Sequence, residues 1–236
     1  MINDSLLPIE DIVKVLDKGE PILVFDDAQR EGETDIFFSA RHVTPASVRF
    51  LRKQGGGMGF LASGYAASEK LGLPFAQDLY RSVNHDSGEF DLLNGMLSHS
   101  LPYDTRSSFS LFINHKDTFT GITDNDRSLT AKSFAELIEE SSHMSGIDCK
   151  VKMAQNYRIP GHVPICIADR KLLQGRQGHT EMIIGLMSSL NLTPVALGCE
   201  MLSDDGNAFS PEEAQTWAQK QGYLFLEGRQ IVEACQ

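Results

Sequence analysis

The sequence predicts an α/β (α+β) fold, in which a single domain contains a mixed central sheet flanked by helices. Short apolar runs typical of buried strands alternate along the chain with segments of helical periodicity. The 236 residues are 41% hydrophobic and 22% charged, which are ordinary values for a globular protein with its own core. No low-complexity tract or internal repeat divides the chain, so residues 1–236 are expected to form one domain.

The first third of the chain predicts helices that alternate with strands. Apolar residues recur at helical spacing before Gly19, and Thr44 followed by Pro45 is typical of a helix start. Three glycines then end that second helix. We expect, in order, a helix over 8–19, a buried strand over 22–25, an apolar segment over 36–40, a helix over 45–54, a strand over 58–62 and a helix over 66–71.

The middle of the chain has a weaker pattern. Residues 75–107 show no clean period, and we expect them to form a lid or mobile loop that closes over a substrate. Residues 108–114 alternate as a strand does. Thr130 has the character of an N-cap, which predicts a helix over 131–140, and residues 141–160 are interpreted as a linker.

The last third returns to regular alternation. Ser210, Pro211 and Glu213 form a capping-box pattern at the start of one helix. We expect a strand over 163–168, a helix that opens at 176–181, a strand over 193–199, a helix over 211–220, a strand over 223–225 and a helix over 227–234.

Charge and cysteine usage exclude several classes of protein. The net charge of −11 and a pI near 5.0 argue against a nucleic-acid partner and against a basic membrane-binding face. No apolar run is long enough for a membrane span, and no signal peptide is visible. The four cysteines lack metal-site spacing and are interpreted as reduced thiols, which predicts a cytoplasmic protein.

An acidic stretch at residues 30–35, with the sequence REGETD, follows the first predicted strand closely. Asp26 and Asp27 precede it, so several carboxylates crowd together beside a single cation, Arg30. A divalent cation such as Mg2+ would compensate for this crowding. The pattern by itself is equally compatible with a solvated acidic turn.

A second polar stretch, residues 175–181, lies at a predicted helix start. Backbone N–H groups at such a start favour an anion, Gly178 permits close approach, and Arg176 and Thr180 add donors. A phosphate fits these groups. His179 has no assignable role from its position alone. Together the two stretches predict a site for a small phosphorylated, oxygen-rich substrate.

Three motifs carry a resemblance to a known family. They are REGETD at 30–35, RQGHTE at 176–181, and Cys199-Glu200 followed by DDGN at 204–207. Their order and spacing resemble 3,4-dihydroxy-2-butanone 4-phosphate synthase over essentially the whole chain. The resemblance implies conversion of ribulose 5-phosphate to the four-carbon precursor of riboflavin with release of formate. It also implies a homodimer with active sites at the subunit interface. The chain lacks a zinc-type cysteine cluster and resembles the stand-alone form.

The resemblance also implies roles for individual residues. Glu31 and His179 match metal ligands for Mg2+ or Mn2+, with two ions per site, and a His ligand is more usual for Mn2+. Residues implied in proton transfer are Asp26, Glu33, His162 and Glu200. Residues implied in substrate binding are Arg30, Glu31, Asp35, Thr120, Arg176, Gln177, Gly178, His179, Thr180 and Glu200. One departure is Ile167, which stands where the family usually has Arg after this His, with Arg170 nearby.

Two other functions use the same groups. One is a metal-dependent sugar-phosphate isomerase or aldolase, which releases no formate. The other is a catalytically inactive sugar-phosphate sensor. The retained set of acids argues against the sensor, because a sensor needs no bases.

Overall fold

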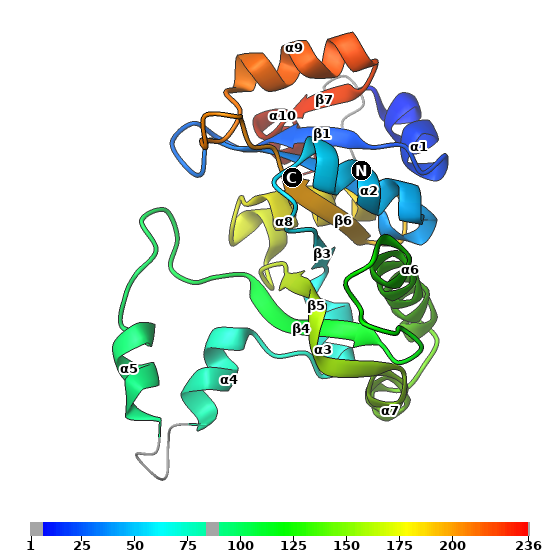
Figure 1. The fold of residues 1–236 in the computed structure, drawn as a ribbon, viewed down its shortest axis with the longest axis vertical. Coiled ribbons are helices and arrows are strands. Elements are labelled where there is room, and N and C mark those ends of the chain that lie inside the picture. The colour runs from blue at the N-terminus through cyan, green and yellow to red at the C-terminus, as the bar shows by residue number, and fades with distance from the viewer. Residues whose placement is uncertain (1–6, 84–89, 236) are drawn as a thin grey trace.

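A computed structural model describes residues 7–83 and 90–235 (Figure 1). One sheet of seven strands has the order β4-β5-β3-β6-β2-β1-β7. The pairs β1–β7 and β3–β5 are parallel and the others antiparallel, so the sheet is mixed, as predicted. The strands are β1 (Ile22–Phe25), β2 (Thr34–Ser39), β3 (Phe60–Ser63), β4 (Phe109–His115), β5 (Tyr157–Ile167), β6 (Val195–Glu200) and β7 (Leu224–Glu227).

Helices cover both faces of the sheet. Successive strand residues alternate between the two faces, so Leu23 and Ile36 belong to one core while Ile22 and Phe37 belong to the other. The first core is completed by α2 (Pro45–Gln54), α3 (Tyr65–Leu71), α6 (Asp124–Ser141), α7 (Gly146–Asn156) and α9 (Pro211–Gln221). The second is completed by α1 (Ile9–Asp17), α8 (His179–Ser189) and α10 (Gly228–Cys235). Burial on both faces explains why the strands are nearly continuous apolar runs.

The irregular segment expected at 75–107 contains two helices, α4 (Ala76–Val83) and α5 (Asp91–Leu97). The expectation of weak secondary structure was therefore wrong for these residues. Neither helix buries a side chain, and both project from the body of the molecule (Figure 1). The two helices are only 8 and 7 residues long, which is too short for a helical period to stand out in the sequence. Part of the expected lid, residues 84–89, lies outside the described residues.

The helix start predicted at Thr130 was also wrong. Helix α6 begins one turn after Gly121, and its N-cap is Thr123, whose hydroxyl accepts from Asp126 N at 3.1 Å. Thr130 lies inside the helix, where its hydroxyl donates to Asp126 O and accepts from His115 N. Thr123 and Thr130 both have the sequence pattern of an N-cap residue. The hydrogen bond from His115 N on β4 explains why a polar side chain is found at position 130 inside the helix.

The predicted linker at 141–160 is instead the helix α7 followed by the first part of β5. Ser145 caps α7 by accepting from Asp148 N at 3.1 Å. Strand β5 begins at Tyr157, whereas the sequence predicts a strand that begins at 163. The additional first half of β5 pairs only with β4, and the second half also pairs with β3. Gly161 belongs to this half, where a Cβ would collide with the backbone of Ile113.

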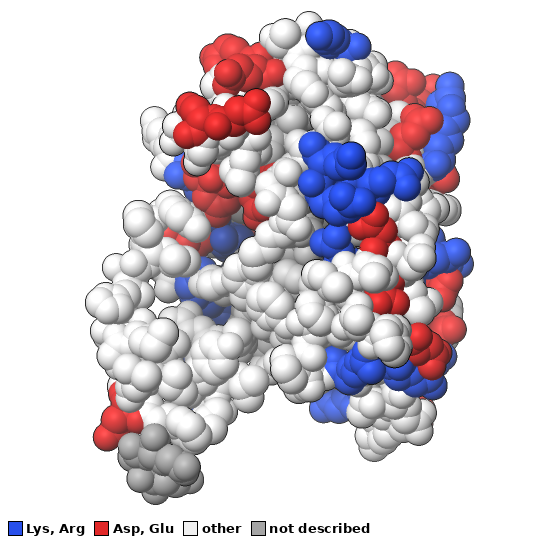
Figure 2. All heavy atoms as spheres, in the orientation of Figure 1, with Lys and Arg blue, Asp and Glu red and all other residues white. Residues whose placement is uncertain are grey.

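Short helical turns complete the chain at η1 (Ala40–His42) and η2 (Leu172–Gln174). Among the residues of 7–83 and 90–235, no helix combines the length and apolarity needed to cross a membrane. Figure 2 shows that the projecting α4–α5 unit carries few charged side chains on the face in view, whereas the body carries many of both signs.

Candidate active site

The acidic loop that joins β1 to β2 is organised by its own first carboxylate. Asp26 is buried, and it accepts hydrogen bonds from the backbone N–H groups of Glu31 and Glu33, each at 3.0 Å. Arg30 Nη1 adds a third contact at 3.3 Å. Gly32 has φ of +69°, a conformation that favours glycine, and this permits the tight turn. The loop is thus a fixed structure and not a solvated acidic turn.

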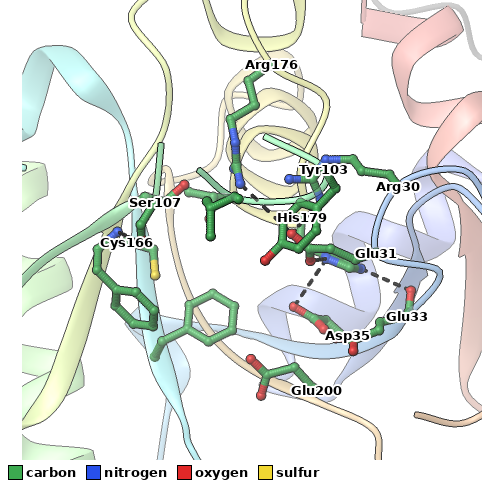
Figure 3. A pocket seen from close by; sticks show the side chains of 15 residues that line it. Arg30, Glu31, Glu33, Asp35, Tyr103, Ser107, Cys166, Arg176, His179 and Glu200 are labelled. Carbon is green, nitrogen blue, oxygen red and sulfur yellow. Dashed lines mark hydrogen bonds and ion pairs between the residues drawn. The ribbon is translucent and has the colours of Figure 1, made fainter. Parts of the chain in front are cut away.

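This loop forms one wall of a pocket of about 360 Å3 (Figure 3). Another part of the wall comes from the segment between α5 and β4, and the rest of the lining comes from β2, β3, β4, β5, β6 and the start of α8. The lining residues are Arg30, Glu31, Glu33, Asp35, Phe60, Leu101, Tyr103, Ser107, Ser108, Phe109, Cys166, Arg176, His179, Thr180 and Glu200. The fold therefore brings the two polar stretches of the sequence together.

His179 lies among the carboxylates of the loop (Figure 3). Its Nε2 atom is 3.2 Å from the carbonyl oxygen of Glu33, which can only accept, so Nε2 carries a proton. Nδ1 faces Glu31 Oε2 at 3.3 Å and Asp35 Oδ2 at 3.8 Å. Atoms of Asp26, Glu31 and His179 that could bind a metal lie within 4.8 Å of one another.

The buried groups of the site strongly shift one another's pKa. Burial raises the pKa of Asp35 to about 8, and the charges of Glu200, Glu31 and Glu33 add to this effect while His179 opposes it. Burial lowers the pKa of His179, but Asp35, Glu31 and Asp26 outweigh burial and raise that pKa to about 9. Burial therefore favours a proton on Asp35, and the surrounding carboxylates favour a proton on His179, when no other cation is bound.

These residues fit a divalent cation. Asp35 Oδ1 is buried and has no hydrogen-bond partner among the described residues, so a buried oxygen is left without compensation. Carboxylate oxygens with one imidazole nitrogen are a donor set suited to Mg2+ or Mn2+. Glu31 and His179 lie where the sequence predicts ligands, and the unpartnered Asp35 oxygen is next to them.

The carboxylates suited to proton transfer line the same pocket. Glu200 ends β6 and lies opposite Asp35 in the β2–β6 register. Burial raises the pKa of Glu33, and the neighbouring charges of Glu31 and Glu200 raise it further against the opposing effect of His179. Burial also raises the pKa of Glu31, but its hydrogen bond to His179 and the charges of His179, Arg30 and Arg176 bring it below the usual value. The acids thus differ in how readily they hold a proton.

Two arginines form the cationic side of the pocket. Arg30 contacts Glu31 at 2.8 Å, and Arg176 Nη1 contacts Glu181 Oε2 at 2.7 Å. Both also contact Asp104, on the segment between α5 and β4. Both guanidinium groups pack closely against Gly178, so a Cβ at this position would force them to shift.

The helix start carries less free donor capacity than predicted. Gly178 N donates to Glu181 Oε2 at 3.2 Å, so this backbone N–H already has an anionic partner. Thr180 is buried and lines the pocket, as a substrate contact would. Gln177 is exposed, and its side chain is not among the lining residues.

Five predicted site residues are not among those that line this pocket. Asp26, Gln177 and Gly178 adjoin lining residues, whereas Thr120 and His162 lie farther from them. His162 is four residues before Cys166 on β5, a separation of roughly 13 Å along a strand. Asn114 on β4 holds it: Asn114 Oδ1 accepts from His162 N at 2.9 Å, and Asn114 Nδ2 donates to His162 Nδ1 at 3.1 Å. The ring proton of the neutral imidazole is therefore on Nε2. Thr120 O lies 3.5 Å from the same amide.

Ile167, the departure from the family pattern, lies in the core on the sheet face opposite Cys166. It is 2% exposed and lines no part of the pocket. Nearby Arg170 lies over the Tyr65 ring at 5.7 Å. The side chain at 167 therefore affects packing of the sheet and has no direct contact with the pocket.

Sequence reasoning missed Tyr103, Asp104, Asn114, Cys166 and Glu181. Asp104 and Tyr103 lie in the segment without periodicity, where nothing distinguished them from other polar residues. Cys166 and Asn114 occur within recognised strands, and strand alternation could have shown that Cys166 faces away from Ile167. Glu181 belongs to the predicted RQGHTE motif, where its capping position was a usable signal.

A mixed sheet whose loops bring acids, a histidine and arginines into one pocket defines an enzyme. The family model of 3,4-dihydroxy-2-butanone 4-phosphate synthase matches residues 10–234. The relative described by that name from Methanothermobacter thermautotrophicus is 38% identical over 232 residues, covering 98% of this chain and 97% of the relative. The chain therefore belongs to the 3,4-dihydroxy-2-butanone 4-phosphate synthase family, which acts in riboflavin biosynthesis.

Solved structures agree with this assignment. The crystal structure of the Candida albicans synthase has a TM-score of 0.70 and 25% identity, covering 96% of both chains. A synthase structure in complex with two magnesium ions also has a TM-score of 0.70, with 19% identity and 94% coverage of both chains. At that lower identity the likeness shows the shared fold.

Proposed function

We propose that this enzyme converts D-ribulose 5-phosphate into 3,4-dihydroxy-2-butanone 4-phosphate and formate. The observation that carries the proposal is the convergence, in one pocket, of carboxylates able to move protons with arginines able to hold a phosphate. Family membership gives the product, and the residues of the pocket supply chemistry suited to forming it.

The proposed reaction is an internal rearrangement. The ketose enolises, loses water and shifts its carbon skeleton, and C4 then leaves as formate. The water lost in the dehydration is regained when formate is released, so the atoms balance without an oxidant or reductant. Each step moves protons between carbon and oxygen, which requires several positioned acids and bases.

Proton transfer is assigned to Glu33, Glu200 and His162. The raised pKa of Glu33 means that this carboxyl holds a proton more readily than an ordinary glutamate does, which suits a group that exchanges protons with the substrate. Glu200 faces the same cavity from the end of β6. Asp26 was also predicted in this role, but its contacts with two backbone N–H groups and Arg30 support a different one. We assign it to holding the acidic loop in place.

Glu31 and His179 are proposed to hold Mg2+ or Mn2+, with two ions per site. When bound, such an ion stabilises negative charge on the sugar oxygens and acidifies its hydroxyl groups. The charge balance supports more than one cation, because the carboxylates around the site outnumber its cationic side chains. The carboxylates are Asp26, Glu31, Glu33, Asp35, Asp104, Glu181 and Glu200, and the cationic side chains are Arg30, Arg176 and His179.

Substrate binding is assigned to the cationic side of the pocket. Arg176 and Thr180 would contact the phosphate, and Arg30 and Asp35 the rest of the sugar phosphate. Gly178 permits close approach, and Gln177 remains a prediction for this turn. The phosphate provides binding energy that positions the reacting carbons.

A homodimer with shared active sites would reunite Thr120 and His162 with the pocket. These residues lie at the β4–β5 end of the sheet, next to apolar side chains that are unusually exposed. Phe119 is 93% exposed, Ile122 is 51% exposed and Ile159 is 60% exposed. Such exposure is typical of an interaction surface. We propose that this surface of one subunit completes the pocket of the other.

The test is incubation with ribulose 5-phosphate and Mg2+, followed by assay of formate. Stoichiometric formate and the C4 phosphate support the proposal, and EDTA should abolish both. An isomerase or aldolase would consume the substrate without formate, and a sensor would bind it without turnover. Either result would reject the proposed reaction. We also propose that residues 1–236 form one domain that acts in the cytoplasm.

A further inference from the structure

The two arginines at the pocket share one unexpected partner. Asp104 Oδ2 contacts both Arg30 Nη2, at 3.1 Å, and Arg176 Nε. The three side chains are shielded from solvent, with exposed fractions of 11% for Asp104, 12% for Arg30 and 15% for Arg176. One carboxylate oxygen therefore bridges two guanidinium groups from separate elements.

The other donors of these arginines are largely engaged. Arg30 Nη1 contacts Asp26 and Glu31, and Arg176 Nη1 contacts Glu181. Asp104 engages Nη2 of Arg30 and Nε of Arg176, while Nη2 of Arg176 lies 4.0 Å from Glu31 Oε1. A phosphoryl oxygen makes the same demand as a carboxylate oxygen, namely short charge-assisted N–H contacts. Asp104 and a phosphate therefore compete for the same donors.

Asp104 is also held near the arginines by its neighbours. Tyr103 lies under Arg30, with the guanidinium carbon 5.4 Å from the ring centroid. Arg106 lies over the Phe75 ring at 3.7 Å and contacts Asp169 at 3.4 Å. None of these contacts involves the carboxylate of Asp104, so exchange of that carboxylate for a phosphate would leave them in place.

We propose that Asp104 is an internal competitor for the substrate phosphate, bound to Arg30 and Arg176 in the free enzyme and displaced from them by the phosphate. This inference rests on the proposed function, which places the phosphate at Arg176, and it extends that phosphate contact to the neighbouring Arg30. A carboxylate carries one negative charge and a phosphate up to two, so the dianion displaces Asp104 more readily than a singly charged anion does. Asp104 thereby sets the affinity and favours doubly charged ligands.

Asp104→Asn is the informative variant. It removes the competing charge, so the Kd of the Mg2+-loaded enzyme for inorganic phosphate should fall by about tenfold, equivalent to about 1.4 kcal/mol. The KM for ribulose 5-phosphate should fall in the same direction. Asp104→Glu retains a carboxylate and should stay closer to the original enzyme. Asp91→Asn removes a similar charge from the exposed start of α5 and should leave the Kd unchanged.

The inference is tested by calorimetric titration of the original enzyme and these three variants with inorganic phosphate. The kinetics of each protein with ribulose 5-phosphate are measured in parallel. A weaker or unchanged Kd in Asp104→Asn would overturn the inference and show that Asp104 positions the arginines. Arg176→Ala separates this failure from failure of the proposed site. If Arg176→Ala weakens phosphate binding while Asp104→Asn does not tighten it, only the competitor role fails. If the unmodified enzyme binds no phosphate, both proposals fail.

Discussion

The body of the pocket and the segment that closes one side of it are built differently. The acidic loop and α8 are fixed by buried contacts, such as those of Asp26 with the loop N–H groups. Helices α4 and α5 bury no side chain, and the segment after them contacts the body mainly through charged and aromatic groups. In the proposed function, the chemistry takes place in the rigid half of the pocket and ligand exchange takes place at the adaptable half.

The β4–β5 end of the sheet differs from both. There Asn114 fixes the orientation of His162, yet no acid or arginine of the pocket contacts either residue in the described chain. His162 therefore has a fixed orientation and lies beside exposed apolar side chains, but the residues that line the pocket of the described chain are not next to it. We call this group the His162 fragment of the site. In the proposed dimer the rigid half and this fragment come from different subunits.

The largest effect is expected at the rigid half. Glu200→Gln retains the shape of the side chain but cannot accept a proton, so formate release should fall by roughly 100-fold or more. Binding of ribulose 5-phosphate, measured by calorimetry, should be nearly unchanged. Normal turnover in this variant would remove Glu200 from the proposed chemistry. Glu212→Gln, in the exposed first turn of α9, is a matched control and should behave as the original enzyme.

Mixed dimers test whether the fragment and the pocket belong to different subunits. His162→Asn and Glu200→Gln homodimers should each be nearly inactive. When the two are unfolded and refolded together at equal amounts, half of the dimers carry one intact site, so roughly a quarter of the original activity should return. No recovery, despite heterodimers seen by mass spectrometry of tagged chains, would place both residues in the same subunit's site.

Metal removal should destabilise the site in a pH-dependent way. The raised folded-state pKa values of about 8 for Asp35 and about 9 for His179 mean that their protons stabilise the metal-free fold at low pH. This contribution is complete below the unfolded values of 3.8 and 6.5, and it is lost as pH rises through 8 and 9. Metal binding needs the deprotonated groups and should increasingly replace the protons.

The measurement is the Tm with Mg2+ minus the Tm with EDTA. We expect this difference to be larger at pH 8.5 than at pH 6.5, by a few degrees. In the His179→Gln variant, the Tm difference between Mg2+ and EDTA should be small at both pH values. An equal shift at the two pH values in the unmodified enzyme would contradict the proton–metal exchange at this pair.

Most strands and helices of the fold could be predicted from the sequence, because the strands are buried on both faces of the sheet. Runs such as 22–25 are apolar at every position and sit between clear turn residues, so their identity was unambiguous. Errors arose where local signals were duplicated or weak. Thr123 and Thr130 both resemble N-caps, and only the contact of Thr130 with His115 on β4 distinguishes them.

The site was predictable to the extent that its residues form contiguous motifs. The loop at 30–35 and the turn at 176–181 could be recognised, and the fold places them in one pocket. Asp104 could not be found, because its importance comes from two arginines distant in sequence and from no local pattern. The separation of His162 from the pocket likewise depends on the pairing of β5 with β4.

The smallest effect is expected in the adaptable half, which the sequence suggested would close over a substrate. Helices α4 and α5 have no buried side chain and should exchange amide hydrogens much faster than α8. If the unit closes over ribulose 5-phosphate, protection of residues 76–83 and 91–97 should rise by about tenfold when the substrate is bound. The contacts of Arg106 with Asp169 and Phe75 do not involve Asp104, so they can hold the segment in place while Asp104 is displaced.

Hydrogen exchange followed by mass spectrometry measures the protection of these two helices, with the Glu200→Gln variant used to prevent turnover of the substrate. Equal protection with and without substrate would show that the pocket works without closure, and the contrast between the two halves would then concern stability alone.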